Sequence, residues 1–256
     1  MAAVTYTTNE LMAVAAARAL QDGQNVIVGL GLPQVAALLA KNTHAPNLNI
    51  IYEIGVVNAE AADPGVGIAD PRLWYRSEYF TSSIGVLGGV LQKGLVDVGF
   101  LGALQIDRFG NLNSTQVKLA DGSIRHFTGS GGAADIATFS RNLFVIIKHE
   151  KRKMTASLDY LTTVGLLQGG DSRSKAGLPM CREVKIITNL CVFGVNRGQN
   201  ILEVQSLHPG VTREDVLANT GFEVKFAADL QTTGIPTEEE TTLLRTQIDP
   251  RGLFIK

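Results

Sequence analysis

The sequence NVIVGLGLPQVAALLAKN, residues 25–42, indicates the fold class. Its aliphatic run Val26–Val28 predicts a buried strand that enters the glycine turn Gly29-Leu30-Gly31. Pro33 follows at a position suited to the first turn of a helix. A second apolar strand, NLNIIYE at 47–53, comes after that helix. Helices that alternate with short apolar strands indicate an α/β protein with an open, mostly parallel sheet and helices on both faces.

The same alternation extends in both directions along the chain. Thr7 and Glu10 have the spacing of a capping box, and the helix they open is predicted to end at Gly23. Further on, IGVLGGVLQKG (84–94) predicts a short helix and VDVGFLGALQID (96–107) predicts a strand. Between these parts, residues 58–83 contain prolines and glycines that break any long element, so they are predicted to be mostly loop.

The last third of the chain is predicted to contain an antiparallel pair of strands in addition to helices and a further strand. NLFVIIKHE (142–150) reads as a strand, while VKIITNLCVFGV (184–195) and NILEVQSL (200–207) flank a turn. This spacing predicts a late antiparallel hairpin. Helices are expected after Thr212 and after Pro236-Thr237. With neither an internal repeat nor a linker in the sequence, residues 1–256 are expected to form a single domain.

Composition excludes several classes of protein. The 256 residues are 45% hydrophobic and 18% charged with a net charge of −1, which provides no basic patch for nucleic acid. There is no secretory signal and no run of about 18 apolar residues to span a membrane. A cytoplasmic protein without bound metal is therefore expected, because the cysteines and histidines lack zinc-site spacing. Of these residues, Cys191 is predicted to be core, His149 solvated beside Glu150, and His208 part of a turn.

Three glycine turns stand near predicted strand ends: Gly29-Leu30-Gly31, Phe100-Leu101-Gly102 and Gly129-Ser130-Gly131-Gly132. Glycine lets backbone amides approach a ligand closely, although such turns often serve packing alone. The first turn does not fit a dinucleotide site, because Gln34 replaces the third glycine. Neither a phosphate loop nor a Gly-x-Ser-x-Gly nucleophile elbow is present.

Glu53 ends a predicted apolar strand. A carboxylate at this position calls for an explanation, because burial of an isolated charge costs free energy. It is either a solvated strand terminus or a reactive group. In open α/β sheets, ligands bind at the carboxyl ends of strands, and Gly31, Glu53 and Gly102 all fall there in the predicted arrangement.

The sequence resembles the β subunits of family I coenzyme A transferases, which have a fold of the NagB/RpiA-like type. The resemblance rests on motifs in order along nearly the whole chain. They are Gly-x-Gly-x-Pro at 29–33, Glu-x-Gly at 53–55, Val-Asp-x-x-Phe-Leu-Gly-Ala-x-Gln at 96–105 and Gly-Ser-Gly-Gly-Ala at 129–133. Longer blocks, such as FTGSGGAADIA (127–137) and SLHPGVTREDVLANTGF (206–222), look like the glutaconate and 3-oxoadipate enzymes.

The resemblance implies that Glu53 is a nucleophile that attacks an acyl-CoA and then carries coenzyme A as a glutamyl thioester, with ping-pong kinetics. It implies an oxyanion hole at the amide of Gly132. Substrate and coenzyme A contacts are expected at Gly29, Gly31, Gly102, Gln105 and Gly131. No permanently bound cofactor is expected, since coenzyme A thioesters are substrates.

The resemblance further implies an α-subunit partner that completes the active site, and a short dicarboxylic or oxo-dicarboxylic acid as the acyl group. Ile54 departs from the small polar neighbour that is usual beside the nucleophile, which bears on acyl specificity. The alternatives are an acyl-CoA decarboxylase or a ring-opening acyl-CoA hydrolase on the same fold, and more distantly a ligand-sensing module without activity.

Overall fold

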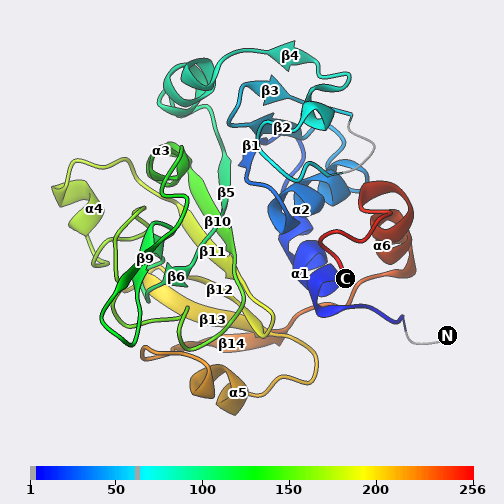
Figure 1. The fold of residues 1–256 in the computed structure, drawn as a ribbon. Coiled ribbons are helices and arrows are strands. Elements are labelled where there is room, and N and C mark those ends of the chain that lie inside the picture. Colours follow the sequence, from blue (N-terminus) through cyan, green and yellow to red (C-terminus); the bar gives the residue numbers. More distant parts are fainter. Residues whose placement is uncertain (1–3, 61–63) are drawn as a thin grey trace. The chain divides into compact units, whose positions relative to one another are not determined.

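The computed structural model describes residues 4–60 and 64–256 of the chain. These residues divide into two compact units (Figure 1). The N-terminal unit holds the described residues up to Phe100 together with Gly234–Lys256, and the C-terminal unit holds Leu101–Thr233. The expected single domain over residues 1–256 stays a prediction.

The N-terminal unit combines helices with a five-stranded arrangement of short strands. Its helical elements are α1 (Thr8–Ala17), α2 (Leu32–Lys41), η1 (Pro71–Trp74), η2 (Gly85–Leu91), α6 (Glu238–Leu243) and η3 (Leu244–Ile248). Its strands are β1 (Asn25–Val28), β2 (Asn49–Tyr52), β3 (Val56–Val57), β4 (Tyr79–Phe80) and the beginning of β5 (Val98–Gly102). Helices α1 and α2 pack against each other, and η3 packs on α2 (Figure 1).

Strand pairing in this unit follows the order β5-β1-β2-β3-β4. β1 is parallel to both β2 and β5, so Val28 lies beside Tyr52 on one side and Phe100 on the other. The carboxyl ends of these three strands therefore meet at one edge. β3 and β4 continue the order antiparallel, and β4 lies within the segment 58–83 that the sequence predicted as mostly loop.

Capping explains where the helices of this unit begin. Thr7 and Glu10 form the predicted capping box at α1, although the helix ends at Ala17, before Gly23. The Glu10 carboxylate is almost fully buried and is also bonded to the Arg245 guanidinium, at 2.6 Å and 2.8 Å. This pair ties the first helix to η3 near the end of the chain.

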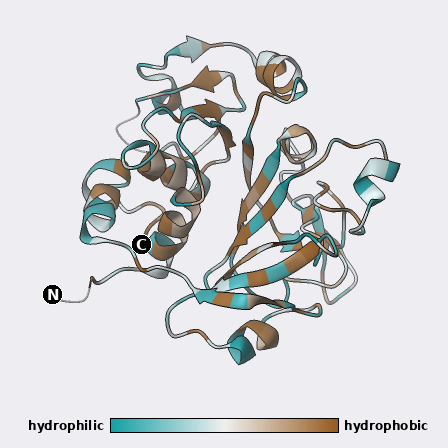
Figure 2. Cartoon of the chain, turned by 180° about the vertical axis from the view of Figure 1, so that it is seen from behind, coloured by the Kyte–Doolittle hydropathy of each residue, from teal (hydrophilic) through white to brown (hydrophobic). Residues whose placement is uncertain are grey.

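The C-terminal unit contains mostly strands. Its strands are β6 (Gln105–Ile106), β7 (Leu112–Asn113), β8 (Gln116–Lys118), β9 (Ile124–His126), β10 (Asn142–Ile146), β11 (Glu183–Ile187), β12 (Cys191–Asn196), β13 (Ile201–Leu207) and β14 (Phe226–Thr232). Its helices are α3 (Ala133–Phe139), α4 (Ser172–Lys175) and α5 (Arg213–Ala218). The longer strands pair in the order β10-β11-β12-β13-β14, and apolar residues alternate with polar ones along several of them (Figure 2).

Pairing confirms the α/β class with parallel central strands and the late hairpin of β12 with β13. Two predicted strands are each divided in the structure. Residues 184–195 form β11 and β12, because the Thr188 hydroxyl accepts hydrogen bonds from the amides of Leu190 and Cys191 and turns the chain. Residues 96–107 divide into β5 and β6.

The prediction that His149 is solvated is wrong, because only 3% of this residue is exposed. Its ring nitrogens lie 3.2 Å and 2.9 Å from the hydroxyls of Thr188 and Thr220. His208 is equally buried and bonds the carbonyl of Thr188 at 2.7 Å. Burial lowers the pKa of both imidazoles, that of His149 to about 4. Cys191 is buried in the core, as predicted.

Within residues 4–60 and 64–256, no helix has both the length and the apolar character needed to cross a membrane.

Candidate active site

Glu53 begins a tight turn between two paired strands. Tyr52, the last residue of β2, pairs with Val56, the first residue of β3. The Gly55 amide donates to the Tyr52 carbonyl at 2.9 Å and closes the turn. Glu53 is half-buried there, at the carboxyl end of a parallel strand. This placement matches the prediction from the sequence.

Gly55 locks this turn against a neighbouring segment. Its φ is +108°, in the region that favours glycine. A methyl group on its Cα would lie 2.0 Å from the Thr81 carbonyl oxygen. The Thr81 amide donates to the Gly55 carbonyl at 2.7 Å, so the two backbones are also hydrogen-bonded. The position of Glu53 is therefore set by backbone packing.

The first glycine turn lies at the same edge as Glu53. Because Val28 and Tyr52 are register partners, Gly29 and Glu53 are the next residues on adjacent parallel strands. The Gly29 amide donates to the Phe100 carbonyl at 3.0 Å, and Gly31, with φ +83°, caps α2. The structure thus brings Gly29, Gly31 and Glu53 to one edge of the N-terminal unit.

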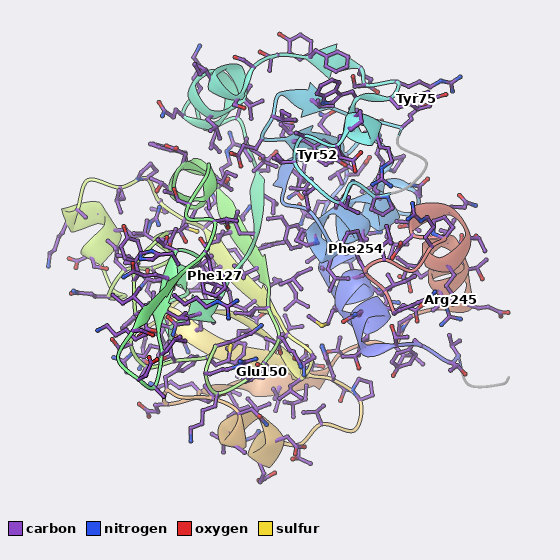
Figure 3. All side chains as sticks on the ribbon, viewed as in Figure 1. Tyr52, Tyr75, Phe127, Glu150, Arg245 and Phe254 are labelled. Atoms are coloured by element: carbon purple, nitrogen blue, oxygen red, sulfur yellow. The ribbon has the colours of Figure 1, made fainter. Side chains whose placement is uncertain are left out.

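Side chains that the sequence did not assign to the site lie close to these two turns. The Gln34 amide nitrogen donates to the Tyr52 hydroxyl at 3.0 Å, and both side chains are buried. Figure 3 shows Tyr52 within the N-terminal unit. Burial raises the pKa of Tyr52 to about 12, against the hydrogen bond from Gln34. Among the described residues the Gln34 Oε1 has no hydrogen-bond partner. The Phe254 ring lies 3.7 Å from where a Cβ on Gly31 would stand.

Few features of the sequence mark Gln34 and Phe254 as neighbours of the site. Gln34 stood out only as the residue that breaks the dinucleotide pattern. Phe254 is far from Gly31 in sequence, and its segment is held by Asp249, whose carboxylate accepts from the amides of Leu253, Phe254 and Ile255. Such a contact has no local sequence pattern.

The glycine-rich loop of the predicted oxyanion hole lies in the C-terminal unit. The Ser114 hydroxyl donates to the Gly129 carbonyl at 3.1 Å, and the Ala133 amide donates to the Ser130 carbonyl at 2.8 Å. Gly129 and Gly131 have φ of +84° and +46°. Gly131 is exposed, whereas Gly132 is buried at the start of α3. The loop therefore combines an accessible and a buried glycine.

Gln105 lies in a buried polar network of the same unit. Its amide nitrogen donates to the Asp159 carboxylate at 2.9 Å. Its amide oxygen accepts from the Asn113 side chain at 2.7 Å and from the Asp159 amide at 3.0 Å. Gln105 is 8% exposed and Asn113 fully buried. With its amide engaged in this way, Gln105 joins the β6–β7 pair to the segment at Asp159, and its predicted substrate contact stays a prediction.

Gly102, the last residue of β5, is exposed, and a Cβ there would lie 4.0 Å from the carbonyl of Ile146 at the end of β10. Gly102, Gln105, Gly131 and Gly132 thus belong to the C-terminal unit, and Gly29, Gly31 and Glu53 to the N-terminal unit.

A separate cavity of about 480 Å³ in the C-terminal unit has three arginines in its wall, Arg173, Arg182 and Arg197. None of the predicted site residues lines it. Within the part of the chain that the structure describes, no cluster of three or more His, Cys, Asp or Glu side chains is arranged to hold a metal ion.

Comparison with known proteins gives consistent matches. The family model described as coenzyme A transferase matches residues 9–219. The chain is 42% identical to a subunit of the 3-oxoadipate CoA-transferase of Pseudomonas knackmussii, over 94% of this chain and 92% of that protein. It is 31% identical to the cholesterol ring-cleaving hydrolase IpdB subunit of Rhodococcus jostii, over 87% and 83%.

The fold agrees with these sequence matches. The crystal structure of glutaconate coenzyme A-transferase from Acidaminococcus fermentans matches with a TM-score of 0.91 and 32% identity, over 98% of both chains. The family match covers most of the chain, and the relative at 42% identity is aligned over nearly its full length. The chain belongs to the coenzyme A transferase family, as a β subunit of the family I type.

Proposed function

We propose that this chain works with an α subunit to move coenzyme A between an acyl-CoA and a short dicarboxylic or oxo-dicarboxylic acid, with Glu53 as the nucleophile. Coenzyme A thioesters are its substrates, no cofactor is bound permanently, and the enzyme is cytoplasmic. The observation that carries this proposal is the Glu53 turn. It presents a half-buried carboxylate at the carboxyl ends of parallel strands, beside the Gly29–Gly31 turn.

The chemistry requires an ionised carboxylate. A Glu53 oxygen attacks the carbonyl carbon of the acyl-CoA, the C–S bond breaks, and coenzyme A leaves as the thiolate. The acyl group is then held on Glu53 as a mixed anhydride. The thiolate attacks the Glu53 carbonyl carbon, which forms a glutamyl thioester and releases the first acid as its carboxylate. The acceptor acid reverses these steps, so the thioester bond energy is conserved.

Each attack places negative charge on a carbonyl oxygen. A backbone amide directed at that oxygen stabilises the charge without reorganisation, and one such donor contributes about 3–4 kcal/mol in well-studied acyl-transfer enzymes. The Gly132 amide is assigned this role, with Gly131 allowing close approach of the substrate. Supporting the assignment, Gly132 is buried and begins a helix, and Gly131 is exposed.

The substrate class rests on the names of the relatives. A 3-oxoadipate and a glutaconate transferase both act on dicarboxylic acids, and each of these relatives is named as one subunit of its enzyme. Hydrolysis or decarboxylation is not favoured, because the hydrolase relative is less similar than the 3-oxoadipate transferase. A non-catalytic sensor is not favoured, because these relatives are named as subunits of transferases and of a hydrolase.

Replacement of the nucleophile tests this proposal. Glu53→Gln retains the size of the side chain, so the assembled enzyme should fold and lose at least about 10³-fold in exchange rate. Glu53→Asp withdraws the carboxylate by one methylene and should lose about 10²-fold, since a misplacement of roughly 1 Å has that effect. Glu60→Gln, an exposed carboxylate of the same unit, is the matched control and should exchange like the wild type.

A panel of acids offered to the same assembled enzyme tests the substrate class. Short dicarboxylic acids and their oxo derivatives should accept coenzyme A. Exchange with monocarboxylic acids alone would refute the class, and wild-type exchange by Glu53→Gln would refute the mechanism.

A further inference from the structure

The cavity of about 480 Å³ in the C-terminal unit is lined only by residues of that unit. We call it the arginine cavity, after Arg173, Arg182 and Arg197 in its wall. The wall comes from α4 and the segments beside it, and from the end of β12 with the turn that follows (Figure 1). Pockets for small molecules have volumes of roughly 300–1,000 Å³, so this cavity has the size of a ligand site.

We propose that the arginine cavity binds a small organic anion, with its phosphate or carboxylate head on the arginines and its apolar body against the aliphatic wall. Arginine is suited to this task, because its planar guanidinium donates two parallel hydrogen bonds to either head group. The inference is independent of the proposed function, since no residue assigned to the reaction lines the cavity.

Positive charge dominates the wall. Against the three arginines stands one carboxylate among the described residues that line the cavity, that of Asp171. It lies 3.1 Å from the Lys175 ammonium and is therefore already paired. The chain as a whole has a net charge of −1, so the three arginines are a local concentration of positive charge that attracts an anion.

Arg173 supplies a buried charge that lacks a counterion. Only 7% of this residue is exposed. Its guanidinium donates to four backbone carbonyls, those of Thr138, Val164, Gly165 and Pro179. Among the described residues no carboxylate forms an ion pair with it. Burial raises the pKa of the nearby Cys181 thiol and keeps it neutral, so the thiol does not balance the charge either. An anion in the cavity would balance it, because carbonyl dipoles stabilise a charge without neutralising it.

Arg182 and Arg197 are the groups that can bond the head of the ligand. Both residues are exposed, and Arg182 has no ion-pair partner within the part of the chain that the structure describes. The Arg197 guanidinium lies 3.8 Å from the Glu183 carboxylate, which is too long for a hydrogen bond. Arg173 acts through its charge alone, because its N–H groups are already bonded to carbonyls.

Apolar side chains supply the surface for the body of the ligand. Leu166 and Val195 are buried, and Leu178 and Met180 also line the cavity. Met180 is 81% exposed, so it lies at the opening. Its flexible thioether can adapt to ligands of different shape. An inorganic ion would leave this surface unused, whereas an organic anion covers both parts of the wall.

The methyl group of Met180 provides a local probe of binding. The chain has four methionines, of which Met12 and Met154 are buried and do not line the cavity. Methionine with ¹³C in its methyl group is incorporated into this chain, which is then assembled with unlabelled α subunit. The signal that disappears in Met180→Leu belongs to Met180, and the signals of Met12 and Met154 serve as internal controls.

Three small aromatic compounds separate the head group from the body. Phenyl phosphate carries a phosphate, phenylacetate a carboxylate and phenylacetamide an uncharged amide. Both anions should shift the Met180 signal to saturation, with dissociation constants at least about 10-fold below that of phenylacetamide, since hydrogen bonds to charged groups are the stronger ones. The anion that binds more tightly identifies the head group. Inorganic phosphate should bind more weakly than phenyl phosphate, because it buries no apolar surface.

Substitution of the exposed arginines locates the site. Arg182→Gln and Arg197→Gln should each raise the dissociation constants of both anions at least about 10-fold. Arg213→Gln is the matched control and should bind like the wild type, because it removes an exposed arginine of the same unit that does not line the cavity. Arg173 is left unchanged, since its bonds to four carbonyls make it part of the fold.

Three results would overturn the inference. They are a Met180 signal that neither anion shifts to saturation, equal affinity for phenylacetamide and the anions, and unchanged affinity in both Arg182→Gln and Arg197→Gln. Circular dichroism of each variant verifies the fold, so that a loss of binding is not mistaken for unfolding.

Discussion

The two units hold their predicted site loops in different ways. In the N-terminal unit, the Glu53 turn is fixed by backbone against backbone, since Gly55 leaves no room for a side chain beside Thr81. In the C-terminal unit, the region near the Gly129–Gly132 loop is held by side-chain hydrogen bonds through Ser114, Asn113 and Gln105. Around Gly129, a Cβ would meet nothing within 4 Å.

This difference suits the two roles proposed. A nucleophile has to be held within a fraction of an ångström, and backbone packing allows little adjustment. The glycine-rich loop also has to hold its amide in place, but the open space around Gly129 lets it accept a small side chain without a clash. Substitutions should therefore be much more damaging at the Glu53 turn than at the glycine-rich loop.

The largest effect is expected from Gly55→Ala. The methyl group would meet the Thr81 backbone, and φ +108° is strained for alanine. We expect a loss of more than about 4 kcal/mol in the free energy of unfolding, measured by urea denaturation. Gly23→Ala is the matched control, since Gly23 also has positive φ but open space around it, and it should lose only about 1–2 kcal/mol. Equal losses would show that packing at Thr81 does not hold the turn.

The next effect is a pH dependence in the C-terminal unit. His149 has a pKa of about 4 in the folded chain because it is buried, against about 6.5 in the unfolded chain. Between these values the unfolded state binds more protons, so stability falls as the pH falls. The neutral His149 imidazole makes its full contribution to stability above about pH 6.5. By pH 4 the free energy of unfolding has fallen by about 3 kcal/mol.

Urea denaturation between pH 7 and pH 4 measures this loss. His149→Gln can keep a hydrogen bond to Thr188 or Thr220 but does not titrate, so its stability should depend less steeply on pH. An identical slope in the variant would contradict burial of a neutral imidazole. His208, whose pKa is also lowered by burial, accounts for part of the remaining slope.

A smaller effect is expected from Gln105→Met. The variant retains the volume but leaves the Asn113 amide and the Asp159 backbone amide without their acceptor. The loss should be about 1–3 kcal/mol of unfolding free energy. If Gln105 only holds Asn113 and Asp159 in place, the KM for the acid should change little. A KM raised tenfold without loss of stability would assign Gln105 to the substrate instead.

The smallest effect is expected from Gly129→Ala. The φ of +84° strains alanine, but there is space for the methyl group, so the loss should be about 1–2 kcal/mol. A loss as large as that of Gly55→Ala would remove the contrast between the two units.

Local patterns predicted much of the fold. The capping boxes at Thr7, Thr212 and Thr237 involve residues three positions apart, so they are visible in the sequence and are all present. The late hairpin has its turn at 197–200 and is likewise local. The position of Glu53 at the end of β2 followed from the apolar run before it.

Contacts between distant residues were not predictable in this way. β4 has two residues and is a strand only through its pairing with β3, which is distant in sequence. His149 was expected in solvent because Glu150 follows it, whereas hydroxyls of Thr188 and Thr220, distant in sequence, bond its ring inside the unit. The contacts of Phe254 with Gly31 and of Gly55 with Thr81 are equally non-local.

The most direct test of the account is to find where coenzyme A is attached. The enzyme assembled from this chain and its α subunit is incubated with an acyl-CoA and no acceptor acid, then digested and analysed by mass spectrometry. The peptide containing Glu53 should carry coenzyme A as a thioester, added dicarboxylic acid should remove it, and Glu53→Gln should never acquire it. Attachment at another residue, or full exchange activity with Glu53 unmodified throughout, would show that Glu53 is not the nucleophile.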